Sequence, residues 1–395
     1  MDIFFYIART KPIIIMLQKR FFYTILFLLG FLNLSLQAQQ TNPFFCHYGK
    51  FKADAKEKLF FRFENLNFAK NDEYKGEFVK GATYIGYVAT PKIVYYPADD
   101  LRIEAGIRLQ KYSGLAEYPN SEPVFSVHYQ ASSSLSLILG TLNQDNNHYL
   151  HEALFEPERF FADRAENGLQ ALFKSERLDF DTWINWEQFI FQNDPFQEVF
   201  TFGLTAGLRL INLESSHSLT IPLQVLFTHR GGEIDSSDSF KQTIGHFGTG
   251  LTYSKAFDNS FFKKINIEAF VFLFRDNSSI KEFAYGKGKG FDFRIGAETK
   301  HSSLKLGYWI GDKFNSSRGS AFFQSMSVID NNYIQKRREI VTAKYRIQKS
   351  IAKGIILGGQ VDTYIDMSSS HDFSYATSLF VKINGEFFLK KLDWK

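Results

Sequence analysis

The feature that most constrains the fold of this chain is the alternation of apolar and polar residues along short segments. From Leu101 the chain reads LRIEAGIRLQ, and residues 291–300 and 341–349 repeat the pattern as FDFRIGAETK and VTAKYRIQK. Successive side chains of a β-strand point to opposite faces. Each segment therefore predicts a strand with one apolar and one polar face.

Such segments recur along the chain, and the connections between them alternate in length. About seven tight turns and eight longer loops separate about 16 segments, an even number as in single-chain bacterial barrels. The longest loops cover residues 143–167 and 312–337, and Pro91 and Pro222 lie inside predicted strands. We therefore predict an all-β fold: a closed antiparallel transmembrane β-barrel of about 16 strands (roughly 14 to 18), with no separate plug or soluble domain.

The composition excludes several other classes of protein. Beyond the N-terminus no run reaches the ~20 apolar residues of a membrane helix. Aromatic residues make up 17% of the chain, which excludes disorder. The single cysteine excludes a disulfide framework, and a net charge of +4 gives no argument for nucleic acid. A soluble β protein is the alternative, but in a bilayer only a closed sheet satisfies its own backbone.

The first residues predict export. Lys19 and Arg20 precede an apolar stretch at 21–34, and Ala38 offers a small-residue cleavage site. We expect a signal peptide at 1–38 with its true start at Met16; the alternative is a retained anchor. Residues 39–58 are then a short periplasmic segment, and 59–395 are the barrel.

The end of the chain carries a resemblance. LFVKINGEFFL from Leu379, with Gly385 followed by Phe387 and Leu389, resembles the carboxy-terminal assembly signal of Gram-negative outer-membrane β-barrels, although the final KKLDWK departs from it. With Gln39-Gln40 after the signal, the chain resembles a porin-like barrel of the Bacteroidota type. The resemblance implies the outer membrane of a Gram-negative bacterium.

Charged residues on the polar faces are expected to line the lumen, because a charge facing lipid near the midplane costs about 2–4 kcal/mol. They could form opposed acidic and basic walls or a salt-bridged interior. Trp183 and Trp309 also fall on the inner face. The basic candidates are Arg102, Arg108, Arg209, Arg294, Lys305, Lys344 and Arg346, and the acidic ones are Glu104, Asp179, Asp181, Glu187, Glu268 and Asp362.

The two longest loops have their own patterns. Residues 143–167 show a short helical pattern around 152–161, which could fold inward as a constriction or cap the barrel from outside. Residues 312–337 form a basic loop with Arg318, which reads as a solvated charge run or as an attractant for anionic solutes or lipopolysaccharide.

Signals for chemistry are weak. His148, His151 and Glu152 have helical spacing, but the HExxH pattern is absent, so they are only a weak metal candidate. No GxSxG occurs, and YGKGKGF at 285–291 lacks the end of a P-loop and reads as a flexible loop. We expect no catalytic residue, no cofactor and no enzyme activity.

The sequence thus favours a porin-like channel for passive diffusion of small polar solutes through a charged lumen. The alternative is a non-conducting barrel that serves as a scaffold or partner subunit of an envelope assembly. The third hypothesis is an outer-membrane barrel enzyme. Expected partners are membrane lipid, lipopolysaccharide, a small polar solute, and a second copy or an envelope protein.

Overall fold

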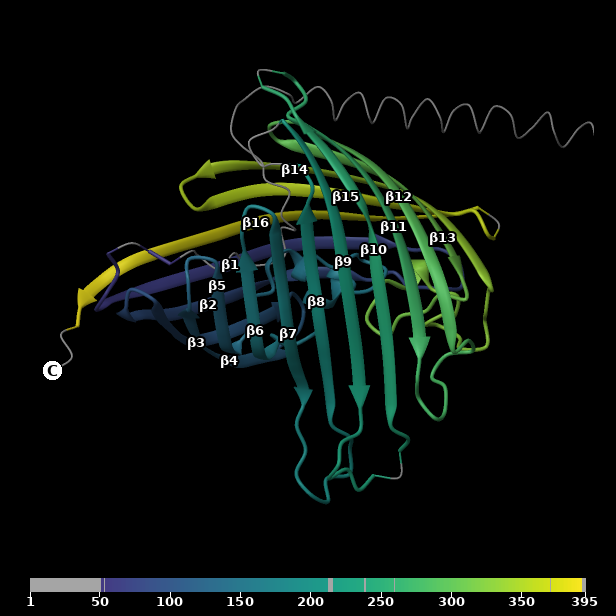
Figure 1. Ribbon diagram of the computed structural model, residues 1–395, viewed down its shortest axis with the longest axis horizontal. Helices are drawn as coiled ribbons and strands as arrows, with labels where there is room; N and C mark the ends of the chain where they lie inside the picture. The colour runs from purple at the N-terminus through teal and green to yellow at the C-terminus, as the bar shows by residue number, and fades with distance from the viewer. Residues whose placement is uncertain are drawn as a thin grey trace, which may run out of the picture. The chain divides into compact units, whose positions relative to one another are not determined.

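A computed structural model describes residues 51–392 except 53, 212–215, 238, 259 and 370. The predicted signal peptide and most of the predicted periplasmic segment lie outside the described residues. Figure 1 shows the strands side by side around one barrel. The sixteen strands are β1 (Lys58–Glu73), β2 (Thr83–Ala98), β3 (Leu101–Tyr112), β4 (Asn120–Gln130), β5 (Leu135–Thr141), β6 (Asn167–Lys174), β7 (Leu178–Gln188), β8 (Val199–Arg209), β9 (His217–Arg230), β10 (Gln242–Ala256), β11 (Lys264–Asp276), β12 (Lys287–Glu298), β13 (Ser302–Asp312), β14 (Arg337–Ala352), β15 (Ile355–Asp366) and β16 (Asp372–Lys391).

The sheet closes on itself. Each strand pairs antiparallel with its neighbours in sequence, and β1 pairs with β16 from Lys58↔Lys391 to Glu73↔Tyr375. Closure leaves no edge strand, so each strand has a hydrogen-bonding neighbour on both sides. The predicted fold class and strand number are confirmed.

The two prolines within strands each interrupt one ladder. Pro91 lies in β2 opposite Phe63, but on the β3 side the pairing skips from Ala89↔Leu109 to Lys92↔Gly106. Pro222 lies in β9, and the β9–β10 pairing likewise skips from Leu223↔Thr249 to Thr220↔Thr252. Since proline has no N–H to donate, these breaks are where the ladders lose a bond.

The alternation of the sequence separates two surfaces. One face of each strand carries exposed apolar side chains such as Ile107, Leu139 and Val271, which form the outer surface. The other face points inward and is largely polar and buried, as Arg102 and Glu104 in β3 illustrate. Within the described residues, no helix is long and apolar enough to cross a membrane.

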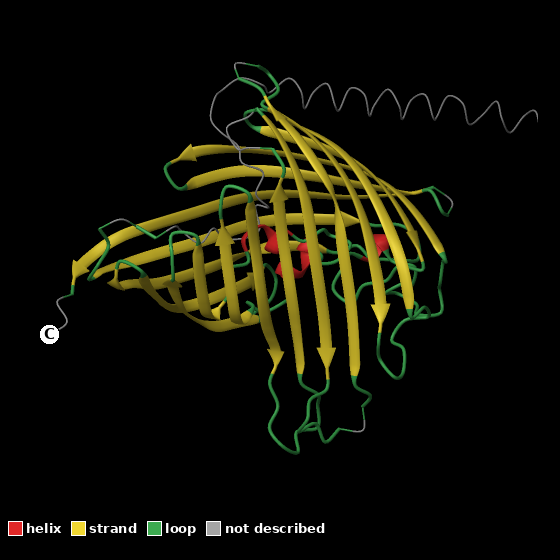
Figure 2. Cartoon of the chain, in the orientation of Figure 1, coloured by secondary structure: helices red, strands yellow, loops and turns green. Residues whose placement is uncertain are grey.

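The turns at one end of the barrel are short, such as Asp99-Asp100 between β2 and β3, and the loops at the other end are long. We call these the short-turn end and the long-loop end. The loops β5–β6 (residues 142–166) and β13–β14 (residues 313–336) fold into the barrel, and we call them together the plug. They carry the 3-10 helices η1 (Asp145–Tyr149), η2 (Pro157–Phe161) and η3 (Ala321–Phe323), which Figure 2 shows in red among the strands.

The plug brings an apolar core into the barrel. Its Leu154, Phe314 and Phe323 pack with Phe272 and Trp309 of the wall, and all five side chains are fully buried. The 312–337 region is therefore not a solvated external charge run. Arg338, just after the plug, is 1% exposed and donates to Asp366 at 2.7 Å.

Two inward tryptophans lie against glycines of neighbouring strands. A Cβ on Gly203 would come within 2.1 Å of the Trp183 ring, and one on Gly290 within 2.2 Å of the Trp309 ring. The inward orientation predicted for both tryptophans is confirmed, since they are 2% and 0% exposed. The missing side chains make room for the indoles, and the indoles in turn support the plug.

This packing gives a test of the plug. Gly290→Ala should displace the Trp309 ring and loosen the plug, because overpacking typically costs about 1–3 kcal/mol. Gly296→Ala on the same strand is the matched control, since the atom nearest to its added Cβ lies 3.5 Å away. Hydrogen exchange of residues 313–336 in the folded barrel should rise for Gly290→Ala alone. Equal protection in both variants would show that Trp309 does not support the plug.

Candidate functional site

At one place the barrel wall is shorter along the barrel axis, because two neighbouring strands are short. Strands β5 and β6 have only 7 and 8 residues. The β4–β5 ladder begins at Ser126↔Gly140, and the β6–β7 ladder ends at Gly168↔Asn185. Toward the long-loop end, β4 and β7 therefore continue without β5 and β6 between them. This gap in the ladder is a notch in the wall.

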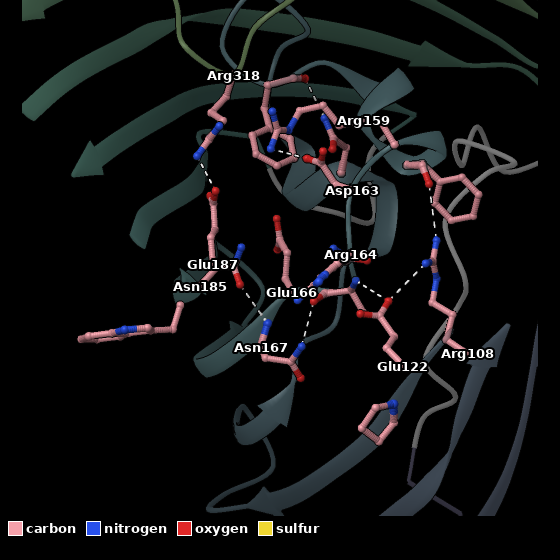
Figure 3. A pocket seen from close by; sticks show the side chains of 18 residues that line it. Arg108, Glu122, Arg159, Asp163, Arg164, Glu166, Asn167, Asn185, Glu187 and Arg318 are labelled. Atoms are coloured by element: carbon pink, nitrogen blue, oxygen red, sulfur yellow. Dashed lines mark hydrogen bonds and ion pairs between the residues drawn. The ribbon is translucent and has the colours of Figure 1, made fainter. Parts of the chain in front are cut away.

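A cavity of about 600 Å³ occupies this notch, and we call it the lateral pocket. Its lining combines wall residues from both sides of the notch, Glu122 of β4 and Glu187 of β7, with the plug segment 159–166 and with Arg318 (Figure 3). Trp186, which faces outward and is 41% exposed, also lines it. The pocket therefore lies between the interior of the barrel and its apolar outer surface.

Ion pairs organise the lateral pocket. Glu122 accepts from Arg108 at 3.2 Å and from the backbone N–H of Ala165 at 2.8 Å. Glu187 accepts from Thr201 at 2.5 Å and pairs with Arg318. These bonds tie the plug to β4 and β7, so the pocket has a fixed shape.

Two arginines of the lateral pocket lie close to one another. Burial lowers the pKa of the Arg159 guanidinium, and the neighbouring charge of Arg318 lowers that pKa further. The Nε atoms of both residues are buried without a hydrogen-bond partner among the described residues. Two adjacent cations with unused donors favour an anion between them.

Asp163 is the carboxyl group of this pocket with a raised pKa. Burial raises the pKa of Asp163, and its ion pair with Arg159 opposes that shift without cancelling it. A raised pKa makes the carboxylate a stronger base. The pocket thus joins a candidate base to candidate anion-binding groups.

The plug is fixed to the wall through His148. Its Nδ1 lies 2.7 Å from Asp181 and its Nε2 lies 2.6 Å from Glu166, while the ring stacks on Trp183 with centroids 3.8 Å apart. Burial lowers the pKa of His148, but the two carboxylates outweigh it and raise that pKa to about 10. His148 is therefore a charged clamp at neutral pH.

The three weak metal candidates do not meet at one point. His151 bonds Asp292 through Nε2 at 3.0 Å, and its Nδ1 accepts from the N–H of Ala153. Glu152 pairs with Arg294 at 2.8 Å and with Lys344. In the part of the chain that the structure describes, no group of three His, Cys, Asp or Glu side chains could hold a metal ion. These residues anchor the plug instead.

The other predicted lumen residues lie on the inward faces of their strands, and most have partners nearby. Arg102 and Glu104 belong to a buried ion-pair cluster near the short-turn end. A second cavity of about 440 Å³ lies against the plug and is lined by Glu268, Arg294, Lys305, Lys344, Arg346 and Asp362. The observed pairs are Arg209 with Asp179, Lys305 with Glu268, Arg346 with Gln360 and Gln360 with Asp362. Acidic and basic groups thus pair locally.

A serine–histidine pair in β4 has its ring proton on the wrong nitrogen for catalysis. Ser126 Oγ lies 3.0 Å from His128 Nε2, and Arg102 lies 3.2 Å from His128 Nδ1. Arginine can only donate, so Nδ1 accepts and Nε2 carries the proton. The ring then donates to Ser126 and cannot act as its base. Ser126 is also 0% exposed.

The clamp at His148 gives a second test. Its folded-state pKa of about 10 lies above the ordinary 6.5, so its contribution is complete below pH 6.5 and is lost as the pH rises through about 10. His148→Gln should destabilise the plug by about 3–5 kcal/mol, because Asp181 and Glu166 lose their counter-charge.

The measurement is hydrogen exchange of residues 142–166, corrected for the intrinsic rate at each pH. The wild type should lose protection between about pH 6.5 and 10, and His148→Gln should be unprotected throughout. His229→Gln in β9 serves as the control, since its ring bonds Thr243 and Gly231 outside the plug. A pH-independent wild type would contradict the clamp.

Comparison with known proteins gives one family and several similar folds. No curated protein sequence matches the chain. Among solved structures, OmpT of Vibrio cholerae with loop L8 deleted is 9% identical, with a TM-score of 0.49, over 83% of this chain and 99% of that one. OprD of Pseudomonas aeruginosa is 11% identical, with a TM-score of 0.45, over 87% and 99%. At these identities and scores the likeness says nothing about function.

The family finding corrects one prediction. A family described as lipid A 3'-O-deacylase-type matches residues 51–392, a range that contains all sixteen strands of the barrel. That description names an enzyme activity, so the prediction that the chain is not an enzyme is wrong. No short catalytic motif of the sequence had pointed to it. The Bacteroidota type stays a prediction. On the extent of this match, the chain belongs to the lipid A 3'-O-deacylase-type family.

Proposed function

We propose that this chain is an outer-membrane hydrolase that removes an ester-linked acyl chain from a lipid A-type glycolipid at the lateral pocket. The observation that carries the proposal is the position of the pocket in the notch, beside the outward-facing Trp186. Phe189 and Phe191, 62% and 71% exposed, follow directly after β7. Aromatic side chains favour the membrane interface, so a lipid headgroup has a lateral route to the pocket.

The groups of the pocket suit a phosphorylated ester. Arg159 and Arg318 would hold a phosphate or the oxyanion that forms during hydrolysis, because their charges and buried donors are already in place. Among the described residues that line the pocket there is no serine, threonine, cysteine or histidine. The attacking group is therefore water, and the base is a carboxylate.

Asp163 is assigned as that base. It takes a proton from water while the water oxygen bonds to the ester carbonyl carbon and the carbonyl electrons move to the oxygen. Collapse of this intermediate breaks the bond to the alkoxy oxygen, which takes the proton back from Asp163. The products are a free fatty acid and a hydroxyl group on the glycolipid, and Asp163 is a carboxylate again.

The activity assay is incubation of the purified protein with lipid A in mixed micelles, followed by mass spectrometry. The wild type should release one fatty acid for each lipid. Asp163→Asn should lower kcat by about 10²–10⁴-fold, since a positioned base contributes that much. Arg318→Gln should also lower the rate.

The control is Glu117→Gln, an exposed carboxylate on the loop between β3 and β4. It should leave the rate unchanged. A wild type that releases no fatty acid would refute the hydrolase. A fully active Asp163→Asn would leave the hydrolase standing but remove Asp163 from its mechanism.

A passive channel for small polar solutes is the second candidate. The observation in its favour is the charged cavity of about 440 Å³, which contains six of the predicted lumen residues. The plug lies between this cavity and the long-loop end, so a continuous path needs the plug to move. Roles as a scaffold subunit or homo-oligomer, and the export route to the outer membrane, rest on the sequence alone.

Conductance across a planar bilayer separates these two functions. The folded wild type should give no steady open current, because the plug fills the long-loop half of the barrel. A variant with residues 145–161 and 314–335 each replaced by a short glycine–serine linker should conduct, since barrels of about 16 strands leave an aqueous pore. Steady current from the wild type would favour the channel over a closed hydrolase.

A further inference from the structure

Most of the glycine–lysine repeat at 285–291 lies in a strand, not in the flexible loop expected from its sequence. Lys287 to Gly290 begin β12. A Cβ on Gly288 would lie 2.0 Å from the backbone oxygen of Lys313, and Gly290 faces Trp309. Lys313 of the plug and Trp309 of the wall leave no room for side chains at these two inward glycines. The intervening Lys287 and Lys289 lie on the outer face, where both are exposed.

Three cations gather there on the outer surface at the long-loop end. Arg275 of β11 pairs across the ladder with Lys287, and Leu273 pairs with Lys289. Like charges directly opposite one another destabilise a sheet. All three cations are exposed, and none forms an ion pair within the described residues. One carboxylate, Asp312 of β13, lies opposite Lys289 in the ladder and lines the same cavity, so the three cations outnumber it. The excess positive charge favours an external anion.

An apolar groove lies against these cations. A cavity of about 600 Å³ is lined by Val225, Phe227, Phe247 and Leu273 together with Arg275, Lys287 and Lys289. A Cβ on Gly245 would lie 2.5 Å from the Phe227 ring, so the glycine is needed for the ring to lie across the wall. We call this surface the basic groove. It lies on β9–β13, whereas the lateral pocket lies on β3–β7.

We propose that the basic groove is a docking surface for a phosphorylated lipid of the membrane leaflet at the long-loop end. The phosphate would neutralise Arg275, Lys287 and Lys289, and an acyl chain would cover Phe227, Phe247 and Leu273. The cations lie beside the apolar side chains, just as the headgroup of a phospholipid lies beside its acyl chain. The inference goes beyond the proposed hydrolase, because it needs binding and no bond cleavage.

The experiment measures lipid binding to the purified full-length mature barrel in detergent by native mass spectrometry. The probes are lipid A carrying both phosphates and the same lipid with its phosphates removed. The wild type should bind the phosphorylated probe at least about tenfold more tightly. Because Arg318 of the lateral pocket can also hold a phosphate, the groove variants are made together with Arg318→Gln, and Arg318→Gln alone should keep most of the preference. In that background Lys287→Glu/Lys289→Glu should lose the preference, and Lys287→Gln/Lys289→Gln should fall between the two.

The control changes the same charge on the outer surface at the short-turn end. Lys255→Glu/Lys349→Glu alters two outward lysines of β10 and β14 and should bind within about twofold of the wild type. The mobility shift of the unheated barrel on a gel verifies folding of each variant. Undiminished binding by Lys287→Glu/Lys289→Glu, or equal binding of both probes by the wild type, would overturn the proposal.

The outcome is independent of the hydrolase assay. A barrel that binds the phosphorylated probe but releases no fatty acid would retain the basic groove and lose the proposed enzyme. A barrel that releases fatty acid with no phosphate preference at the groove would do the reverse. Since neither Lys287 nor Lys289 lines the lateral pocket, the variants separate the two sites.

Discussion

The ladder between β1 and β16 is the constraint on which the rest of the structure depends. Pairing from Lys58↔Lys391 onward gives the first and last strands a partner on both sides, which a sheet exposed to lipid requires. A closed sheet has only two faces, and lipid takes one of them. Every group that avoids lipid is therefore directed into a confined interior, where charges must find partners and bulky rings must find space.

The plug supplies partners for the charges and rings of the interior, and it also carries residues of the candidate site. His148 lies between Asp181 and Glu166, and Glu152 lies between Arg294 and Lys344. Removing one member of a buried pair leaves the other uncompensated, at a cost of several kcal/mol. These contacts fix the loop that carries Arg159 and Asp163, so the geometry of the lateral pocket depends on ion pairs outside it.

Much of the fold could be predicted because it is local. Period-two patterning and turn length define the strands within a few residues, and they placed Trp183 and Trp309 on the inner face. The site could not be predicted in this way, because Arg159 and Arg318 come from loops far apart in sequence and meet only inside the barrel. The channel hypothesis assumed an open interior, and strand number alone carries no information on what fills it. The lysines of β12 alternate with glycines, which give no apolar signal for a strand.

The short β5–β6 hairpin determines the direction from which a substrate can reach the lateral pocket. A substrate that enters through a gap in the wall approaches by diffusion in the plane of the membrane and never leaves its leaflet. The rate of encounter then follows the mole fraction of the lipid at the surface, so diluting the lipid with inert detergent slows turnover even when its bulk concentration is constant. A barrel that opened only along its axis would have no such dependence.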